Sequence, residues 1–330
     1  MRTLLLLSLL LLATSLWADS GQQRAETAGR GLVGTPAPDL VLTTIDGKRI
    51  DLAQLYDKKA VYLKFWATWC VPCREQMPHF ERTYERAGDD LAVIAIDVGF
   101  EDSVAQVRRY RREMGLKMPI VFDTDGALGQ AFHLRVTPQH VVIGRDGRIA
   151  YVGHEADARL EAALAAARRA PAAAVAGDPL RPASTRPVER LPALAIPTLG
   201  GGVFRLGAPQ PTALVFLSPW CESYLAASRP AYAAECRAMR EQVTALARRP
   251  GVRWLGIASG LWADPDDLAA WRRQHAIGWP LALDADGALF RRFGVMHVPT
   301  VLLADAQGRI VARVEQHAQL AAAVREVAAR

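Results

Sequence analysis

The stretch "KFWATWCVPCREQMP", residues 64–78, places two cysteines where one structural pattern changes into another. The apolar run from Ala60 to Phe65 predicts a buried strand, and the charged stretch from Pro72 to about Arg86 predicts a helix. Proline is favoured in the first turn of a helix, where its missing N–H costs no hydrogen bond. The sequence therefore predicts Cys70 at the helix N-terminus and Cys73 one turn further on.

A dithiol in this position is suited to redox chemistry. Free backbone N–H groups and the helix dipole stabilise an anion at a helix N-terminus, which lowers the pKa of a thiol there. We expect Cys70 to attack a substrate disulfide and form a mixed disulfide. Cys73 would then attack Cys70 and release the reduced product.

Other uses of two nearby cysteines are less well supported. A structural zinc site would need two more ligands, and Cys221 and Cys236 are far along the chain and are not a Cys-x-x-Cys pair. A permanently closed disulfide across so short a loop would restrain few residues of the unfolded chain. The stretch before Cys70 also lacks the Pro-x-x-x-Thr-x-x-Cys pattern of peroxidatic cysteines.

The composition indicates an ordinary globular protein. The chain has 330 residues, of which 51% are hydrophobic and 22% charged, and this length allows two domains. Its net charge of +6 comes with acidic and basic residues interspersed, whereas nucleic-acid-binding proteins concentrate Lys and Arg in a patch. We expect no nucleic-acid partner, and no glycine pattern for a nucleotide cofactor is present.

The first residues resemble a secretory signal. Arg2 precedes an apolar run from Leu4 to Ala13, and the small residue Ala18 is a possible cleavage point, which predicts a signal peptide over residues 1–18. An uncleaved membrane anchor is the alternative. Either would place the protein in the periplasm, where disulfides form and persist.

The sequence contains an internal repeat. Residues 123–149 align without gaps on residues 284–310, with ten identical positions. The segments around Cys70 and Cys221 match at a shift of 151 residues, whereas the segments at 123–149 and 284–310 match at a shift of 161 residues. The second copy therefore carries ten extra residues between its cysteine segment and residue 284.

The order of elements predicts an α/β fold of two similar domains, at residues 34–168 and 192–330, joined by an Ala/Pro-rich linker at 169–191. In each copy, alternating strands and helices indicate a mixed sheet covered by helices on both faces. For the first copy the predicted elements are a hairpin over 40–52, strands over 60–65 and 91–98, helices over 72–86 and 104–114, a hairpin from 139–143 and 148–152, and a closing helix over 155–168.

Several of these segments together resemble a known family. The match consists of "FWATWCVPCREQMP", the opening "GTPAPDLVLTTIDGK" at 34–48, the "FDTDG" segment and the isolated Thr137-Pro138. In these features the chain is similar to the TlpA/ResA-like exported thiol-disulfide oxidoreductases of the thioredoxin superfamily. The resemblance is close over 34–168 and continues in degenerate form over 192–330.

The resemblance implies roles for residues outside the dithiol. Pro138 would be a cis-proline facing the two cysteines, and its backbone, with that of Thr137, would pair with an extended substrate chain. Trp69 would flank the thiol and shape the contact surface.

The resemblance also implies partners and a direction. Electrons would pass from a membrane thiol donor to disulfide-containing exported client proteins, such as apocytochrome c or copper-site assembly factors, with the Cys70–Cys73 disulfide as the redox group and no separate cofactor or metal. The alternative is a copper-handling or assembly factor that binds clients with its thioredoxin-like domains. The scarcity of Met and His clusters near the cysteines argues against it.

Two positions depart from the family pattern. The buried Asp of thioredoxins, six residues before the first cysteine, is replaced by Lys64, and the Glu common in ResA-like members, six residues after that cysteine, is replaced by Gln76. A lysine beneath the dithiol would favour the thiolate if charged, or carry a proton if burial lowered its pKa.

In the second copy, Cys221 keeps the position of the attacking thiol, but Tyr224 replaces the second cysteine. The even number of cysteines favours a Cys221–Cys236 disulfide in an oxidising compartment. Fifteen residues of straight helix would separate them by about 22 Å, but Pro230 is expected to break that helix and allow the chain to fold back. We expect a structural bridge there, with a slow redox pair as the second possibility and two free thiols as the alternative to any bond.

Overall fold

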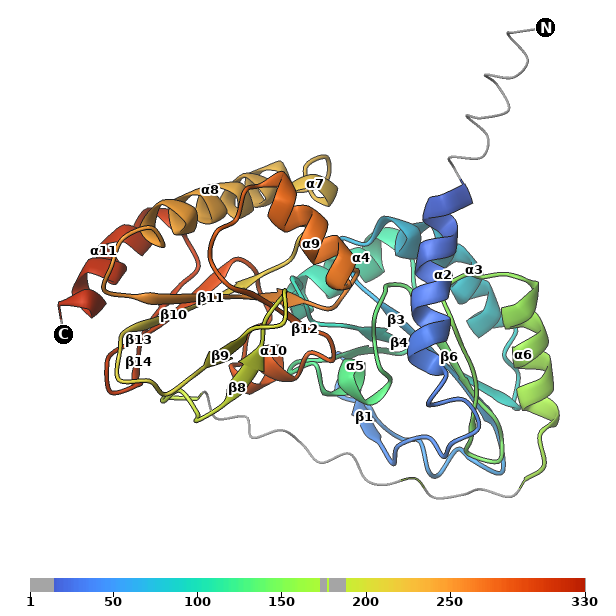
Figure 1. Ribbon diagram of the computed structural model, residues 1–330. Helices are drawn as coiled ribbons and strands as arrows, with labels where there is room; N and C mark the ends of the chain where they lie inside the picture. Colours follow the sequence, from blue (N-terminus) through green and yellow to red (C-terminus); the bar gives the residue numbers. More distant parts are fainter. Residues whose placement is uncertain (1–14, 173–176, 178–187, 330) are drawn as a thin grey trace, which may run out of the picture. The chain divides into compact units, whose positions relative to one another are not determined.

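The protein forms two compact units, which clustering of the chain divides into Met1–Arg181 and Pro182–Arg330 (Figure 1). A computed structural model describes residues 15–172, 177 and 188–329. Residues 1–14 of the expected signal and most of the expected linker lie outside this described part. Each unit is considered by itself below.

The first unit contains a central five-stranded mixed sheet in the order β5-β4-β3-β6-β7, beside a small hairpin, β1-β2. Strands β3, β4 and β5 are parallel, whereas β6 is antiparallel to β3 and β7 is antiparallel to β6. The elements in chain order are α2 (Ser15–Gly29), β1 (Val41–Thr43), β2 (Arg49–Asp51), β3 (Ala60–Trp66), α3 (Val71–Glu85), β4 (Leu91–Asp97), α4 (Val104–Met114), β5 (Ile120–Phe122), α5 (Ala127–Ala131), β6 (Gln139–Ile143), β7 (Ile149–Gly153) and α6 (Ala158–Arg169).

Strand β3 is the centre of this unit, since every one of its residues is buried. Its side chains alternate between the two faces of the sheet. On one face Tyr62 meets Phe80 of α3, and Trp66 meets Tyr110 of α4, each with ring centroids 5.0 Å apart. On the other face Phe65 packs against the ring that follows α5. A strand buried along its whole length is typical of a sheet covered on both faces.

The helices covering this sheet begin and end as their sequences dictate. Ser103 caps α4 by accepting from the N–H of Gln106, and Gly115 ends it in the left-handed conformation that glycine adopts without strain. Asp157 caps α6, whose Glu161 contacts His79 of α3 at 2.8 Å, so α3 and α6 lie on the same face.

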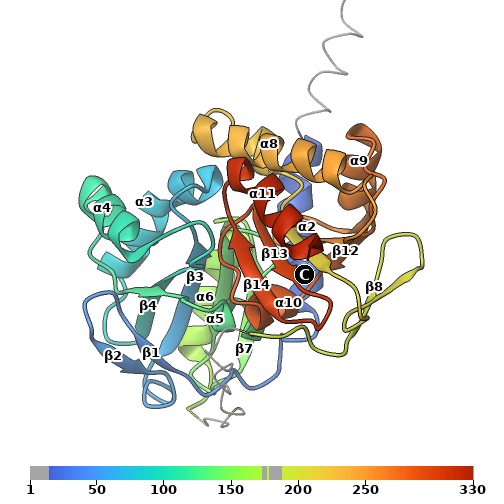
Figure 2. The ribbon, with the colours of Figure 1, turned by 90° about the vertical axis from the view of Figure 1, so that its left-hand side faces the viewer.

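The second unit repeats this architecture. Its sheet has the order β12-β11-β10-β13-β14, with the same pattern of parallel and antiparallel pairs, beside the hairpin β8-β9. Helix α11 lies against β13 and β14 (Figure 2). The elements are β8 (Ala195–Pro197), β9 (Val203–Arg205), β10 (Thr212–Leu217), α7 (Cys221–Tyr224), α8 (Pro230–Leu246), β11 (Arg253–Ser259), α9 (Pro265–Gln274), β12 (Leu281–Asp284), α10 (Ala288–Arg292), β13 (Thr300–Ala304), β14 (Ile310–Val314) and α11 (His317–Ala328).

The predicted fold class, two similar α/β units of thioredoxin-like topology, is confirmed. The predicted strands and helices of the first unit appear within a few residues of their expected limits. Three elements escaped prediction: the short β5 and α5, and helix α2, which begins within the segment assigned to the signal. Among the described residues, no helix has both the length and the apolar character needed to cross a membrane.

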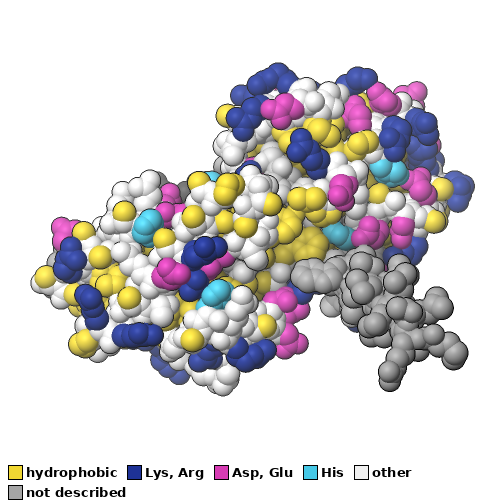
Figure 3. Space-filling view, turned by 90° about the horizontal axis from the view of Figure 1, so that it is seen from above, with side chains coloured by type: hydrophobic (Ala, Val, Ile, Leu, Met, Phe, Trp, Pro, Cys, Tyr) yellow, Lys and Arg dark blue, Asp and Glu magenta, His cyan; other side chains and the backbone are white. Residues whose placement is uncertain are grey.

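Charged side chains of both signs alternate over the face drawn in Figure 3. This arrangement agrees with the interspersed charges of the sequence.

Candidate active site

The two cysteines of the first unit form a disulfide at the start of α3. Cys70 is the N-cap residue, Cys73 lies in the first turn, and their Cα atoms are 5.2 Å apart. The backbone N–H of Cys73 donates to Sγ of Cys70 over 3.2 Å. Once the disulfide is reduced, the same N–H would stabilise a thiolate on Cys70. Val71, between them, is 50% exposed, so the turn reaches the surface.

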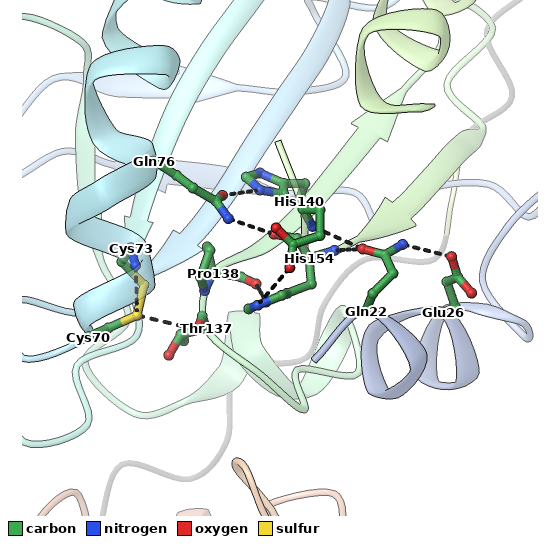
Figure 4. A network of polar contacts seen from close by, with 10 residues as sticks. Gln22, Glu26, Cys70, Cys73, Gln76, Thr137, Pro138, His140 and His154 are labelled. Atoms are coloured by element: carbon green, nitrogen blue, oxygen red, sulfur yellow. Dashed lines mark hydrogen bonds and ion pairs between the residues drawn. A yellow bond between two sulfur atoms is a disulfide. The ribbon is translucent and has the colours of Figure 1, made fainter. Parts of the chain in front are cut away.

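The loop before β6 faces this disulfide. The Thr137–Pro138 peptide bond is cis, and the carbonyl oxygen of Thr137 lies 3.3 Å from Sγ of Cys70 (Figure 4). The β3–β6 pairing brings the loop here, because β3 leads directly into the dithiol turn and β6 begins directly after Pro138. The structure therefore places these two residues beside the sulfur of Cys70.

Trp69 forms part of the wall of the site. Its indole N–H donates to the carbonyl of Phe100 at 2.8 Å, and only 4% of the residue is exposed. The preceding residue, Thr68, is bound through its N–H and its hydroxyl by the carboxylate of Asp102, at 2.7 and 2.5 Å. The loop after β4 thus holds the turn that presents Cys70.

A second acidic residue, Asp97, interacts with Asp102, and sequence reasoning missed it. Asp97, at the end of β4, is fully buried, and one of its carboxyl oxygens accepts from the N–H of Gly99 at 2.9 Å. Burial, followed by the charge of Asp102, raises the pKa of Asp97 well above its usual value.

Lys64 lies in β3 beneath the helix that carries the dithiol. Its side chain is completely buried, and its ammonium nitrogen has no hydrogen-bond partner among the described residues. The nitrogen lies 5.4 Å from the centre of the Phe80 ring, on the face that α3 covers. Burial lowers the pKa of Lys64 to about 7, because a charge is costly in an apolar surrounding.

A chain of hydrogen bonds runs beside Lys64. His140, its partner in the β3–β6 register, is fully buried between the hydroxyl of Tyr62 and the amide oxygen of Gln76, each at 2.8 Å from a ring nitrogen. Burial, and then the charge of Lys64, lower the pKa of His140 well below its usual value. Sequence reasoning missed this bridge, since the strand pairing that creates it joins distant segments.

The chain continues to the cis-proline loop and to helix α2. The amide of Gln76 donates to the carbonyl of His154 at 3.2 Å, and the ring of His154 contacts the carbonyl of Pro138 at 2.7 Å (Figure 4). Gln22 of α2 accepts from the N–H of His154 at 2.8 Å. Sequence reasoning missed His154 and Gln22, since they join the site only through the pairing of β6 with β7 and the packing of α2.

Comparison with known proteins places this first unit. Residues 33–152 match the family described as AhpC/TSA. The thiol-disulfide oxidoreductase ResA of Bacillus subtilis is 32% identical over 120 residues, which cover 36% of this chain and 65% of that protein. ResA of Geobacillus thermodenitrificans is 31% identical over 153 residues, covering 45% of this chain and 83% of that protein.

The chain belongs to the ResA-type thiol-disulfide oxidoreductases.

Solved structures also resemble this ResA-type chain. A putative thioredoxin from Neisseria meningitidis is 30% identical with a TM-score of 0.37, covering 40% of this chain and 89% of that one. StoA from Bacillus subtilis is 25% identical with a TM-score of 0.34, covering 39% and 98%. The chain spans 65–66% of the length of the first three ResA relatives.

The second unit of this ResA-type chain carries a different cysteine arrangement. Cys221 begins α7 and is joined to Cys236 in α8, with Cα atoms 6.3 Å apart. The chain turns before Pro230, which is the first residue of α8, so the two helices fold together. Tyr224, in place of the second cysteine, is 39% exposed.

Proposed function

We propose that this protein is an exported thiol-disulfide oxidoreductase that reduces disulfides in exported client proteins. The observation that carries the proposal is the Cys70–Cys73 disulfide at the N-terminus of α3, with Sγ of Cys70 3.3 Å from the carbonyl of Thr137. A sulfur that attacks a polypeptide needs the polypeptide held beside it. A backbone carbonyl in an extended loop can hold a client segment by strand-like pairing.

The reaction begins with the reduced dithiol. The Cys70 thiolate attacks one sulfur of a client disulfide, so that the new Cys70–client bond forms as the client S–S bond breaks. The client's other sulfur leaves as a thiolate and takes up a proton. Cys73, deprotonated, then attacks Sγ of Cys70, which closes the protein disulfide and releases the second client thiol. Two electrons pass to the client, and a membrane thiol donor restores the dithiol.

Proton transfer at Cys73 is the step for which we propose a role for Lys64. Cys73 is completely buried and must lose its proton as it attacks. A buried amine with a pKa of about 7 exchanges protons readily near neutral pH. The neutral amine of Lys64 would accept the proton that Cys73 loses. The hydrogen bond between Gln76 and His140 would hold these two side chains in place beside Lys64.

The periplasm is the compartment we propose for this chemistry. The N-terminal segment has the charged start and short apolar run of an export signal. Fractionation of cells expressing the full chain tests the location: recovery in the cytoplasmic fraction alone would contradict it.

Insulin reduction tests the activity. The full chain should accelerate turnover with dithiothreitol as the donor, and Cys70→Ser should return the rate to that of dithiothreitol alone. Cys73→Ser should accumulate mixed disulfides with exported clients, which identifies them. Wild-type protein that binds Cu(I) but leaves the insulin rate unchanged would favour a copper-handling factor and overturn the proposal.

A further inference from the structure

The disulfide of the second unit faces a second cis-proline loop. The Val298–Pro299 peptide bond is cis, and Sγ of Cys236 lies 3.9 Å from the carbonyl oxygen of Val298. In the first unit the corresponding distance, from Cys70 to the carbonyl before Pro138, is 3.3 Å. In both units, therefore, a disulfide sulfur lies beside the carbonyl that precedes the cis-proline.

The two units present this sulfur from different elements. In the first unit it comes from the N-cap of α3, whereas Cys236 lies two turns inside α8. Cys221, which aligns with Cys70, lies behind it at the start of α7. The hydroxyl of Tyr232, also in α8, donates to the carbonyl of Val298 and fixes α8 against the loop.

The second disulfide is no less accessible than the first. Cys236 is 8% exposed and Cys221 1%, compared with 1% for Cys70 and 0% for Cys73. A small pocket of about 20 Å³, about the room of one water molecule, is lined by both cysteines and by Pro299. By its exposed fraction, Cys236 is therefore at least as open to a substrate as Cys70.

The fold around the second disulfide has another link that does not depend on it. Glu222 of α7 forms a two-pronged ion pair with Arg240 of α8, at 2.6 and 3.1 Å, and both side chains are largely buried. This pair joins the same two helices as the disulfide. A bidentate pair of this kind is among the stronger polar contacts in proteins. This ion pair would continue to link the two helices once the disulfide is open, as a redox site requires.

We propose that Cys221 and Cys236 form a second thiol-disulfide exchange site, whose substrates are protein disulfides held against Val298–Pro299. In the reducing direction, the Cys236 thiolate attacks a substrate disulfide and forms a mixed disulfide, while the other substrate sulfur leaves and is protonated. The Cys221 thiolate then attacks Sγ of Cys236, closes the Cys221–Cys236 bond and releases the second substrate thiol. Two electrons pass to the substrate, and a dithiol such as dithiothreitol restores the site.

Reduction of the native chain is the first test. The oxidised full-length protein is incubated with dithiothreitol without denaturant, quenched with acid, and alkylated so that peptide mapping reports each disulfide separately. We expect Cys221–Cys236 to open with the circular dichroism spectrum unchanged and to close again in oxidised glutathione. A bond that stays closed until denaturant is added, while Cys70–Cys73 opens, would overturn the proposal.

The second test assigns the attacking sulfur in a full chain that carries Cys70→Ser and Cys73→Ser. In that background, Cys221→Ser leaves Cys236 as the free thiol, and Cys236→Ser leaves Cys221. Because thiol exchange depends on access, we expect the Cys236 thiol to react with a chromogenic disulfide about tenfold faster than the Cys221 thiol. The reverse order would overturn the assignment of Cys236. The first site is absent from both proteins, so this result does not depend on the function proposed for it.

Discussion

Replacing Lys64 with methionine should stabilise the first unit in a pH-dependent way. Burial lowers the pKa of Lys64 from 10.5 to about 7. Between these two values the unfolded chain binds more protons at this residue than the folded chain, so stability rises with pH across that range. At 1.36 kcal/mol per pKa unit, the difference of 3.5 units corresponds to about 5 kcal/mol.

The full cost of burying the charge applies below pH 7 and disappears above pH 10.5. Methionine has a similar length and carries no charge, so Lys64→Met removes that cost. We expect the variant to exceed the wild type in free energy of unfolding by up to about 5 kcal/mol at pH 6. The excess should shrink steadily from pH 7 and approach zero near pH 10.5.

Hydrogen exchange in urea measures this difference for the first unit alone, through peptides from β3 and β4. Subtracting the free energy of unfolding of the wild type from that of the variant at each pH cancels the contribution of all other titrating groups. The matched control is Lys58→Met, which replaces an exposed lysine two residues before β3 and should show no trend with pH. A Lys64→Met difference that is constant from pH 6 to pH 10.5, or that grows with pH, would refute the reasoning.

Three further outcomes are expected in the first unit. Iodoacetamide should label Cys70 of the reduced protein before Cys73, as peptide mapping would show; the opposite order would exchange their roles. Gln76→Ala should destabilise the unit by about 1–3 kcal/mol because it leaves one ring nitrogen of the buried His140 without its partner, whereas Glu75→Ala, on the exposed side of the same helix, should be neutral in urea unfolding. Asp102→Ala should slow insulin reduction more than Asp102→Asn, which keeps an acceptor for the turn before the dithiol; equal rates would contradict that role.

The fold class was predictable because its signals are local. An apolar run from Ala60 to Phe65 followed by a proline-containing charged stretch specifies a buried strand and a helix. The same pattern occurs again near Cys221, which indicates two similar units. The short elements β5 and α5 were not predicted, because a segment of three to five residues is too short for its periodicity to distinguish a strand or a helix from a loop.

The surroundings of the dithiol could be predicted only in part. Lys64 and Gln76 were singled out by their spacing from Cys70, but their contacts were not. The bridge through His140 depends on the register of β3 against β6, which pairs His140 with Lys64, 76 positions earlier. Such a register is set by the packing of the whole sheet.

The sequence alone determined the chemistry available to this protein: two thiols at a helix N-terminus, a second cysteine pair, and a proline loop in each unit. Those features depend on neighbouring residues along the chain. Only the tertiary structure decided which groups meet: Gln22 with His154, 132 residues later, and Cys236 rather than Cys221 with the carbonyl of Val298. Contacts of this kind form when distant segments pack into one core, and local propensity does not encode them.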